Sequence, residues 1–200
     1  KVGLSQSNYI IYLVKEVITG IVLGYICYGF FTSFYVLGQI VDMEIGFGMV
    51  NVIDPQNKIQ VPIMGNFYYV LAFLLFLIID GHHMLIKGLI DSYKYIPIGK
   101  TVIDDGSIES LINILGKTFS IGFKMSCPIV ASMLLSNILL GILSRTMPQM
   151  NIFVVGMPFK IIIGLLIIGV TVPLFIKFSK GIFNDMFKAL YDFYKGLSKG

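Results

Sequence analysis

Hydrophobic positions in this sequence gather into four stretches that contain no charged residue. They are Val17–Val41, Ile59–Ile79, Met125–Ser144 and Ile161–Ile176. A helix needs about 20 apolar residues to cross a bilayer, so the first three stretches are long enough and the last is marginal. The last stretch lengthens if Lys160 is accepted within the helix, because the residues before it are also uncharged. The pattern predicts an all-α protein whose helices lie in a membrane.

The second half of the chain predicts a helical hairpin followed by an amphipathic tail. A helical pattern runs from Ser107 to about Ser144, "SRTMPQMN" supplies a tight turn, and a second helix covers Ile152–Ile176. In the tail, apolar residues recur every three or four positions, on the face opposite to its lysines. These apolar residues are Phe178, Ile182, Met186, Leu190, Phe193 and Leu197. Such a helix lies on a membrane surface, or else it packs on its own protein or continues into a further domain, and the pattern fits both placements.

The composition agrees with placement in a membrane. Hydrophobic residues make up 56% of the chain, charged residues 13%, and the mean hydropathy is +0.85, whereas soluble domains carry about 25% charged residues. The net charge of +4 gathers towards the end of the chain, which favours an anionic lipid surface over nucleic acid. The chain begins at Lys1 without a signal peptide, so we expect it to be part of a longer protein.

The residues that carry reactive groups predict neither a metal site nor an enzyme. The two histidines stand together in "DGHH", Asp80–His83. Adjacent side chains diverge by about 100° on a helix, so these histidines would not chelate one ion together unless the chain bends. No third ligand stands at metal spacing. Asp42 and Asp80 flank apolar stretches, at a predicted interface, and no catalytic or cofactor motif is found along the chain.

Lys160 is the exception to the exclusion of charge from apolar stretches. It stands in "VVGMPFKIIIG", with long apolar runs on both sides. An ionisable group at such depth faces a water-filled lumen or a polar group on a partner, unless its long stem reaches the interface. The alternative function for this protein is a secondary transporter, which would place its binding site at a broken helix around Gly156, Pro158 and Lys160.

The segment "EIGFGMVNVIDPQNKIQ", Glu44–Gln60, is too apolar for a loop in water and too rich in glycine and turn residues for a membrane helix. Irregular backbone at membrane depth is tolerated where it lines a cavity or is buried in protein. The segment therefore predicts a re-entrant or pore-plugging loop, with an ordinary loop buried under neighbouring helices as the alternative. The residues predicted to form the plug are Ile45, Gly46, Phe47, Gly48, Met49, Val50, Ile53, Asp54 and Pro55.

Three segments of the chain together resemble the FliR family, whose members FliR, SpaR and EscT are export-gate subunits of flagellar and injectisome type III secretion systems. They are "GQIVDMEIGFGMVNVIDPQNKIQVPIMGNF", "DGHHMLIKGLIDSYKYIPIG" and "RTMPQMNIFVVGMPFKIIIGLLI". The ordered motifs run over nearly the whole chain. The family usually has asparagine where Asp80 stands, and it has further hydrophobic segments before the region that begins here at Lys1.

The resemblance implies a single copy of this chain in a helical pore assembly in the bacterial inner membrane, within the flagellar basal body. Its expected partners are several FliP-like and FliQ-like subunits, a FlhB-like subunit at the closed entrance, lipid and unfolded export substrates. The resemblance also divides the chain into a FliP-like portion over 1–106 with its plug loop at 44–60, a FliQ-like hairpin over 107–176 and an amphipathic helix over 177–200. It implies no cofactor.

Overall fold

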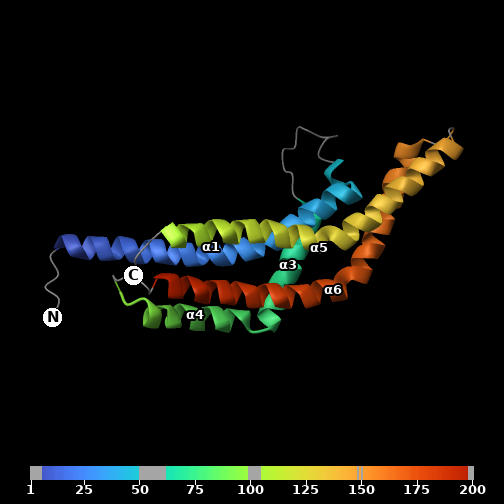
Figure 1. The fold of residues 1–200 in the computed structure, drawn as a ribbon. Helices are drawn as coiled ribbons and strands as arrows, with labels where there is room; N and C mark the ends of the chain where they lie inside the picture. The colour runs from blue at the N-terminus through green and yellow to red at the C-terminus, as the bar shows by residue number, and fades with distance from the viewer. Residues whose placement is uncertain (1–5, 50–61, 99–104, 148, 150, 198–200) are drawn as a thin grey trace. The chain divides into compact units, whose positions relative to one another are not determined.

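The computed structural model describes residues 6–49, 62–98, 105–147, 149 and 151–197, and the regular elements in these ranges are all helices. They are α1 (Gln6–Ile45), the short 3₁₀ helix η1 (Phe47–Met49), α3 (Ile63–Ile78), α4 (Gly81–Tyr95), α5 (Asp105–Thr146) and α6 (Ile152–Leu197), shown in Figure 1. The prediction of an all-α protein is confirmed.

Three of the helices, α1, α5 and α6, are long and apolar enough to cross a membrane, and α3 with α4 would make a fourth span if the bent pair is counted as one. This confirms the class of integral membrane protein. The lengths differ from the prediction at two places. The marginal stretch belongs to α6, which continues through Lys160, whereas the second stretch yields only the 16 residues of α3. Pro62 precedes α3, so part of that apolar stretch lies before the helix.

The chain forms two compact units, and the first comprises Lys1–Phe31, Leu74–Thr118 and Lys180–Gly200. Three phenylalanines make the centre of its core: the ring of Phe31 lies 5.3 Å from Phe76 and 5.7 Å from Phe183, and the last two rings are 5.3 Å apart. Aromatic rings at such distances gain edge-to-face and tilted contacts beyond the area that they bury.

The tail belongs to α6, without a break after Ile176. Its apolar face is buried in the first unit, and Lys180, Lys188 and Lys195 are exposed. The buried members of the predicted set are Ile182, Met186, Leu190, Phe193 and Leu197. Of the two placements that the sequence left open, the structure has the one in which the tail packs on its own protein. Phe178 differs from the others, since it is exposed and lies in the second unit.

The second unit comprises Thr32–Phe73 and Phe119–Ser179. The ring of Phe175 on α6 lies 5.7 Å from Phe34 and 5.1 Å from Tyr68, which joins α6 to α1 and α3. Glycines let the helices approach closely here. A β-carbon added at Gly38 would overlap the backbone at Gly65, so α1 and α3 touch main chain to main chain.

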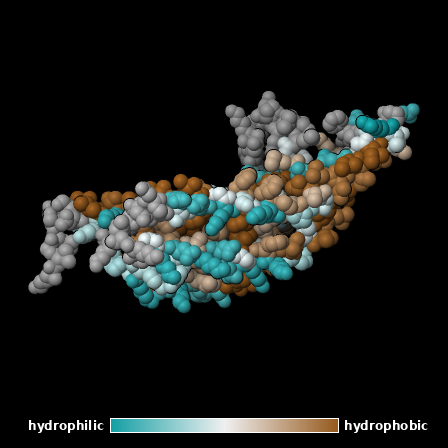
Figure 2. Space-filling view, in the orientation of Figure 1, coloured by the Kyte–Doolittle hydropathy of each residue, from teal (hydrophilic) through white to brown (hydrophobic). Residues whose placement is uncertain are grey.

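Large hydrophobic side chains cover much of the surface of the second unit. Figure 2 shows this as brown atoms over the hairpin of α5 and α6, while teal atoms gather over α4 of the first unit. Leu135, Leu166 and Val170 are all more than half exposed, and Val170 reaches 80%. An apolar surface of this kind is covered in the working protein by lipid or by other subunits.

Candidate functional site

The candidate site is the place where the predicted plug leaves α1. The helix ends at Ile45, Gly46 turns the chain with φ 96°, and η1 follows. Positive φ is open to glycine at little cost, which explains why glycine stands at this turn. Gly48 does not need positive φ. Val50, Ile53, Asp54 and Pro55 lie outside the described residues.

Ile45, the first residue of the predicted plug, is 1% exposed and packs against α6. A β-carbon added at Gly164 would lie 2.6 Å from Ile45 Cγ1, so the isoleucine fills the space that this glycine leaves. Phe47 and Gly48 are half-buried. Ile45 therefore fixes the start of the segment to the wall of the second unit.

The contact that sequence reasoning missed is made by Asp42, on the last turn of α1. Its carboxylate is 5% exposed and accepts three hydrogen bonds. Met64 N donates to Oδ1 at 3.0 Å and to Oδ2 at 3.1 Å, and Gly65 N donates to Oδ2 at 3.2 Å. Both amides lie in the first turn of α3, where backbone N–H groups have no partner within their own helix. The carboxylate thus caps another helix, and its charge suits the positive end of the helix dipole.

The sequence placed Asp42 at an interface and gave it no role, but the structure buries it. One signal was present in the chain: an acidic residue stands just before the irregular segment, and Pro62 marks the start of a helix just after it. The contact between these two helix ends could not be predicted from the amino-acid sequence. The bonds connect residues 22 and 23 positions apart.

Lys160 lies on α6, one helical turn before Gly164, and is half-buried. Residues four apart share a helix face, so Lys160 stands on the side of α6 that meets Ile45. Among the described residues it has no hydrogen bond and no ion pair. The helix continues through Gly156 and Pro158. The broken helix that the transporter alternative requires is therefore not found.

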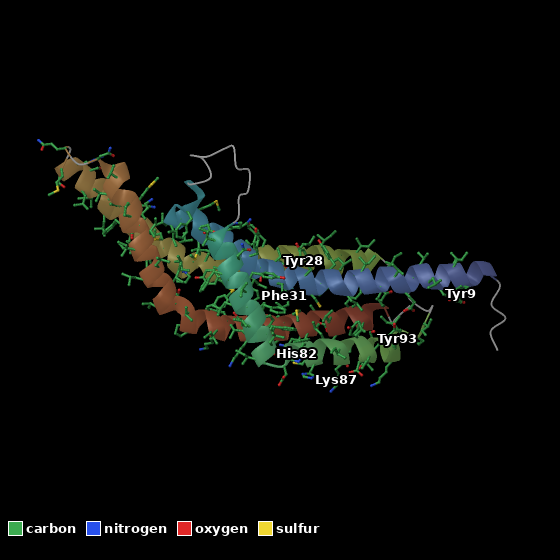
Figure 3. The ribbon with its side chains drawn as sticks, turned by 180° about the vertical axis from the view of Figure 1, so that it is seen from behind. Tyr9, Tyr28, Phe31, His82, Lys87 and Tyr93 are labelled. Carbon is green, nitrogen blue, oxygen red and sulfur yellow. The ribbon has the colours of Figure 1, made fainter. Side chains whose placement is uncertain are left out.

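The chain bends by 71° between α3 and α4, at Asp80, which has φ 57°. The bend brings one ligand atom each from Asp80, His82 and His83 within 4.8 Å of one another, and we call these residues the Asp-His-His cluster. His82 lies at the start of α4 (Figure 3). The sequence excluded joint chelation by the two histidines unless the chain bends, and the chain does bend just before them. The ring centroids of His82 and His83 lie 4.1 Å apart, and His83 Nδ1 lies 3.5 Å from Asp80 Oδ1.

Two imidazoles and a carboxylate are a donor set that divalent transition metals accept. In this cluster, however, the side chains of His83 and Asp80 are 72% and 76% exposed. No further ligand joins the group within the described part of the chain. A mostly solvated set of three ligands holds an ion weakly, so the expectation that the chain binds no metal stays a prediction.

Long apolar helices and a buried carboxylate that is bonded by backbone amides define a helical integral membrane protein. The model of the family described as bacterial export proteins, family 1, matches residues 2–186. The chain is 35% identical to the flagellar biosynthetic protein FliR of Bacillus subtilis, over 90% of this chain and 70% of that protein. Identity to FliR of Pectobacterium carotovorum is 31%, over 93% and 71%, and to FliR of Escherichia coli 29%, over 90% and 69%.

The chain therefore belongs to the bacterial export proteins of family 1, and the relatives named above are FliR proteins. The resemblance based on three segments of the sequence is confirmed. The division into FliP-like and FliQ-like portions stays a prediction.

Proposed function

We propose that this chain is a pore-forming structural subunit of a flagellar protein-export gate in the bacterial inner membrane, with no enzymatic role of its own. Membership in a family of export proteins and the names of its relatives support the export role. In this proposal, unfolded substrates pass through a lumen to which the chain contributes. The segment Glu44–Gln60 closes that lumen when no substrate is present.

One observation supports the plug: the helices on both sides of the segment are fixed inside the second unit. Ile45 is buried against α6 at its start, and the first turn of α3, just after its end, is bonded to Asp42. Because irregular backbone at membrane depth must line a cavity or be buried in protein, a pore interior suits this segment.

A pore for unfolded proteins must meet two opposing requirements, and an apolar plug meets both. An unfolded polypeptide needs a wide passage, yet an open passage would leak ions across an energised membrane. An apolar constriction excludes water and ions by dewetting without covalent closure. In the proposal Phe47, Met49, Val50 and Ile53 make the apolar seal. Gly46 and Gly48 let the segment bend aside when substrate arrives, and Asp54 with Pro55 fixes the turn that returns it to the wall.

The proposed partners are several FliP-like and FliQ-like subunits, with a FlhB-like subunit at the entrance. The apolar surface of the α5–α6 hairpin supports an assembly, since it needs a cover. Three helical glycines add to this. Gly20, Gly24 and Gly169 have open space beside them in this chain, which leaves room for close packing by a neighbouring helix. Lys160 is proposed to face the lumen or a polar group on such a neighbour.

The plug is tested by ion leakage in cells that assemble the complete export complex. Deleting Gly46–Val52 should raise leakage above that of the wild type. A second variant keeps the length and replaces Phe47, Met49, Val50 and Ile53 by serine, and it should leak as well, because a polar constriction stays wet. Co-purification of the partner subunits measures assembly in each case. If both variants assemble normally and leakage stays at the wild-type level, the segment is not the plug.

A further inference from the structure

We infer that Asp42 is a positioning residue for the plug, an inference that rests on the proposed function. Its buried carboxylate ties the last turn of α1 to the first turn of α3. The segment Glu44–Gln60 connects these two helices, so the tie fixes the distance between the helix ends that the segment joins. Asp42 acts through α3 and the segment and need not itself touch the exported chain.

The first support is the geometry of the tie. Both carboxylate oxygens are used, and two successive amides of α3 donate to them over 3.0 to 3.2 Å. A buried carboxylate is costly unless it is hydrogen-bonded, and bonds to an ionised acceptor are stronger than neutral ones. Three bonds to the positive end of a helix meet this need. The carboxylate is therefore suited to hold α3 at one place.

The second support is the spacing along α1. Gly38, Asp42 and Ile45 are four and three positions apart, so they share one face of the helix. Each makes a different contact on that face: Gly38 meets the backbone of Gly65, Asp42 bonds its amide, and Ile45 fills the space beside Gly164. The last two turns of α1 are thus fixed to both α3 and α6, and Asp42 is the polar member of this set.

The third support is the contrast with the next helix start. Asp80 precedes α4, yet its side chain makes no capping hydrogen bond. It is also three-quarters exposed. A carboxylate before a helix therefore need not cap that helix in this protein, whereas Asp42 reaches across to a helix that begins 21 positions later. The long-range cap occurs at the segment that is proposed to close the pore.

The test uses the complete protein with its partner subunits and compares three variants. Asp42→Ala removes all acceptors, and Asp42→Asn keeps one side-chain oxygen that can still accept from Met64 or Gly65. Ser126→Ala is the matched control, because Ser126 is also fully buried in the second unit but bonds only the Phe123 carbonyl of its own helix. Ion leakage, co-purification of partners and hydrogen exchange at the amides of Met64 and Gly65 are measured for each.

We expect several-fold higher leakage for Asp42→Ala, an intermediate value for Asp42→Asn, and the wild-type value for Ser126→Ala. Exchange at the two amides should accelerate in the same order. The partial rescue by asparagine distinguishes a positioning role from a general loss of packing.

The other outcomes would overturn either the positioning role of Asp42 or the proposed plug. If deletion of Gly46–Val52 leaks while both Asp42 variants assemble and stay tight, the positioning role is wrong and the proposed plug stands. If neither Asp42 variant assembles, Asp42 is needed for folding and the positioning role is overturned. If the deletion itself does not leak, the proposed function fails, and unchanged amide exchange would show separately that Asp42 does not hold α3.

Discussion

The substitution Gly38→Ala tests the packing that brings the roots of the plug together. Gly38 lies where α1 crosses α3, one helical turn before Asp42. A β-carbon at this position would lie less than 3.0 Å from backbone atoms of Met64 and Gly65. These are main-chain atoms, so no side chain can rotate to make room. The two helices must separate.

The separation can be bounded from the structure. The added β-carbon would lie closer than 3.0 Å to these atoms, whereas ordinary van der Waals contact begins at 3.4 Å. The backbones must therefore move apart by more than 0.4 Å, the difference between 3.4 and 3.0 Å. Added to the 3.2 Å bond from Gly65 N to Asp42, this displacement takes the donor and acceptor beyond 3.5 Å, where the hydrogen bond is lost. Overpacking costs about 1–3 kcal/mol, and a bond to a charged acceptor about 1.5–3 kcal/mol. Alanine returns about 1 kcal/mol of helix propensity, so the net loss is roughly 1.5–5 kcal/mol.

The assay compares the purified export complex carrying Gly38→Ala with the wild type, by thermal dissociation and by hydrogen exchange at Met64 and Gly65. Gly141→Ala is the matched control, since Gly141 also lies in a helix of the second unit but has nothing within 4 Å of an added β-carbon. The control should be as stable as the wild type or slightly more stable, and Gly38→Ala should dissociate at lower temperature with faster exchange. Equal stability of the two variants, with unchanged exchange, would refute the proposed contact between α1 and α3.

Four further predictions address the rest of the molecule. Lys160→Leu should lower assembly and secretion, because the proposed lumen or partner contact needs a charge, while Lys160→Arg should keep both; wild-type secretion by the leucine variant would remove that role. Gly81→Ala should destabilise the complex by about 1–3 kcal/mol in thermal dissociation, because the added β-carbon would overlap the ring of Phe76, whereas Gly181→Ala has open space and should not. Expressed without partner subunits, the chain should aggregate or be degraded, and recovery of a monodisperse monomer would contradict the proposed assembly. Treatment with a metal chelator should leave assembly and secretion unchanged, and a loss that added Zn²⁺ restores would instead assign a metal to the Asp-His-His cluster.

The sequence by itself determined the features that depend on local pattern. Apolar stretches of membrane length predicted helices in lipid, since a backbone in hydrocarbon must satisfy its hydrogen bonds within the segment. The turn in "SRTMPQMN" placed the hairpin, and α5 and α6 end and begin at Thr146 and Ile152. The spacing of apolar residues in the tail identified the face that is buried. The three ordered motifs were sufficient to identify the family.

The length of α6 shows where local rules gave an incomplete answer. The charge at Lys160 made the fourth stretch marginal in the sequence, but a lysine on a half-buried helix face does not interrupt backbone hydrogen bonding. The helix therefore runs on to Leu197.

Only the tertiary structure decided which polar and small residues matter at the root of the plug. Gly20 and Gly24 show the spacing typical of close helix packing, yet they are open in this chain, whereas Gly38 meets Gly65. Asp42 flanks an apolar stretch, a position that predicts an acid at the membrane interface, yet it is buried on the first turn of α3. Both outcomes depend on which helices cross and at what residue. That choice is made by the packing of side chains distant in sequence, which the period of a single helix does not encode.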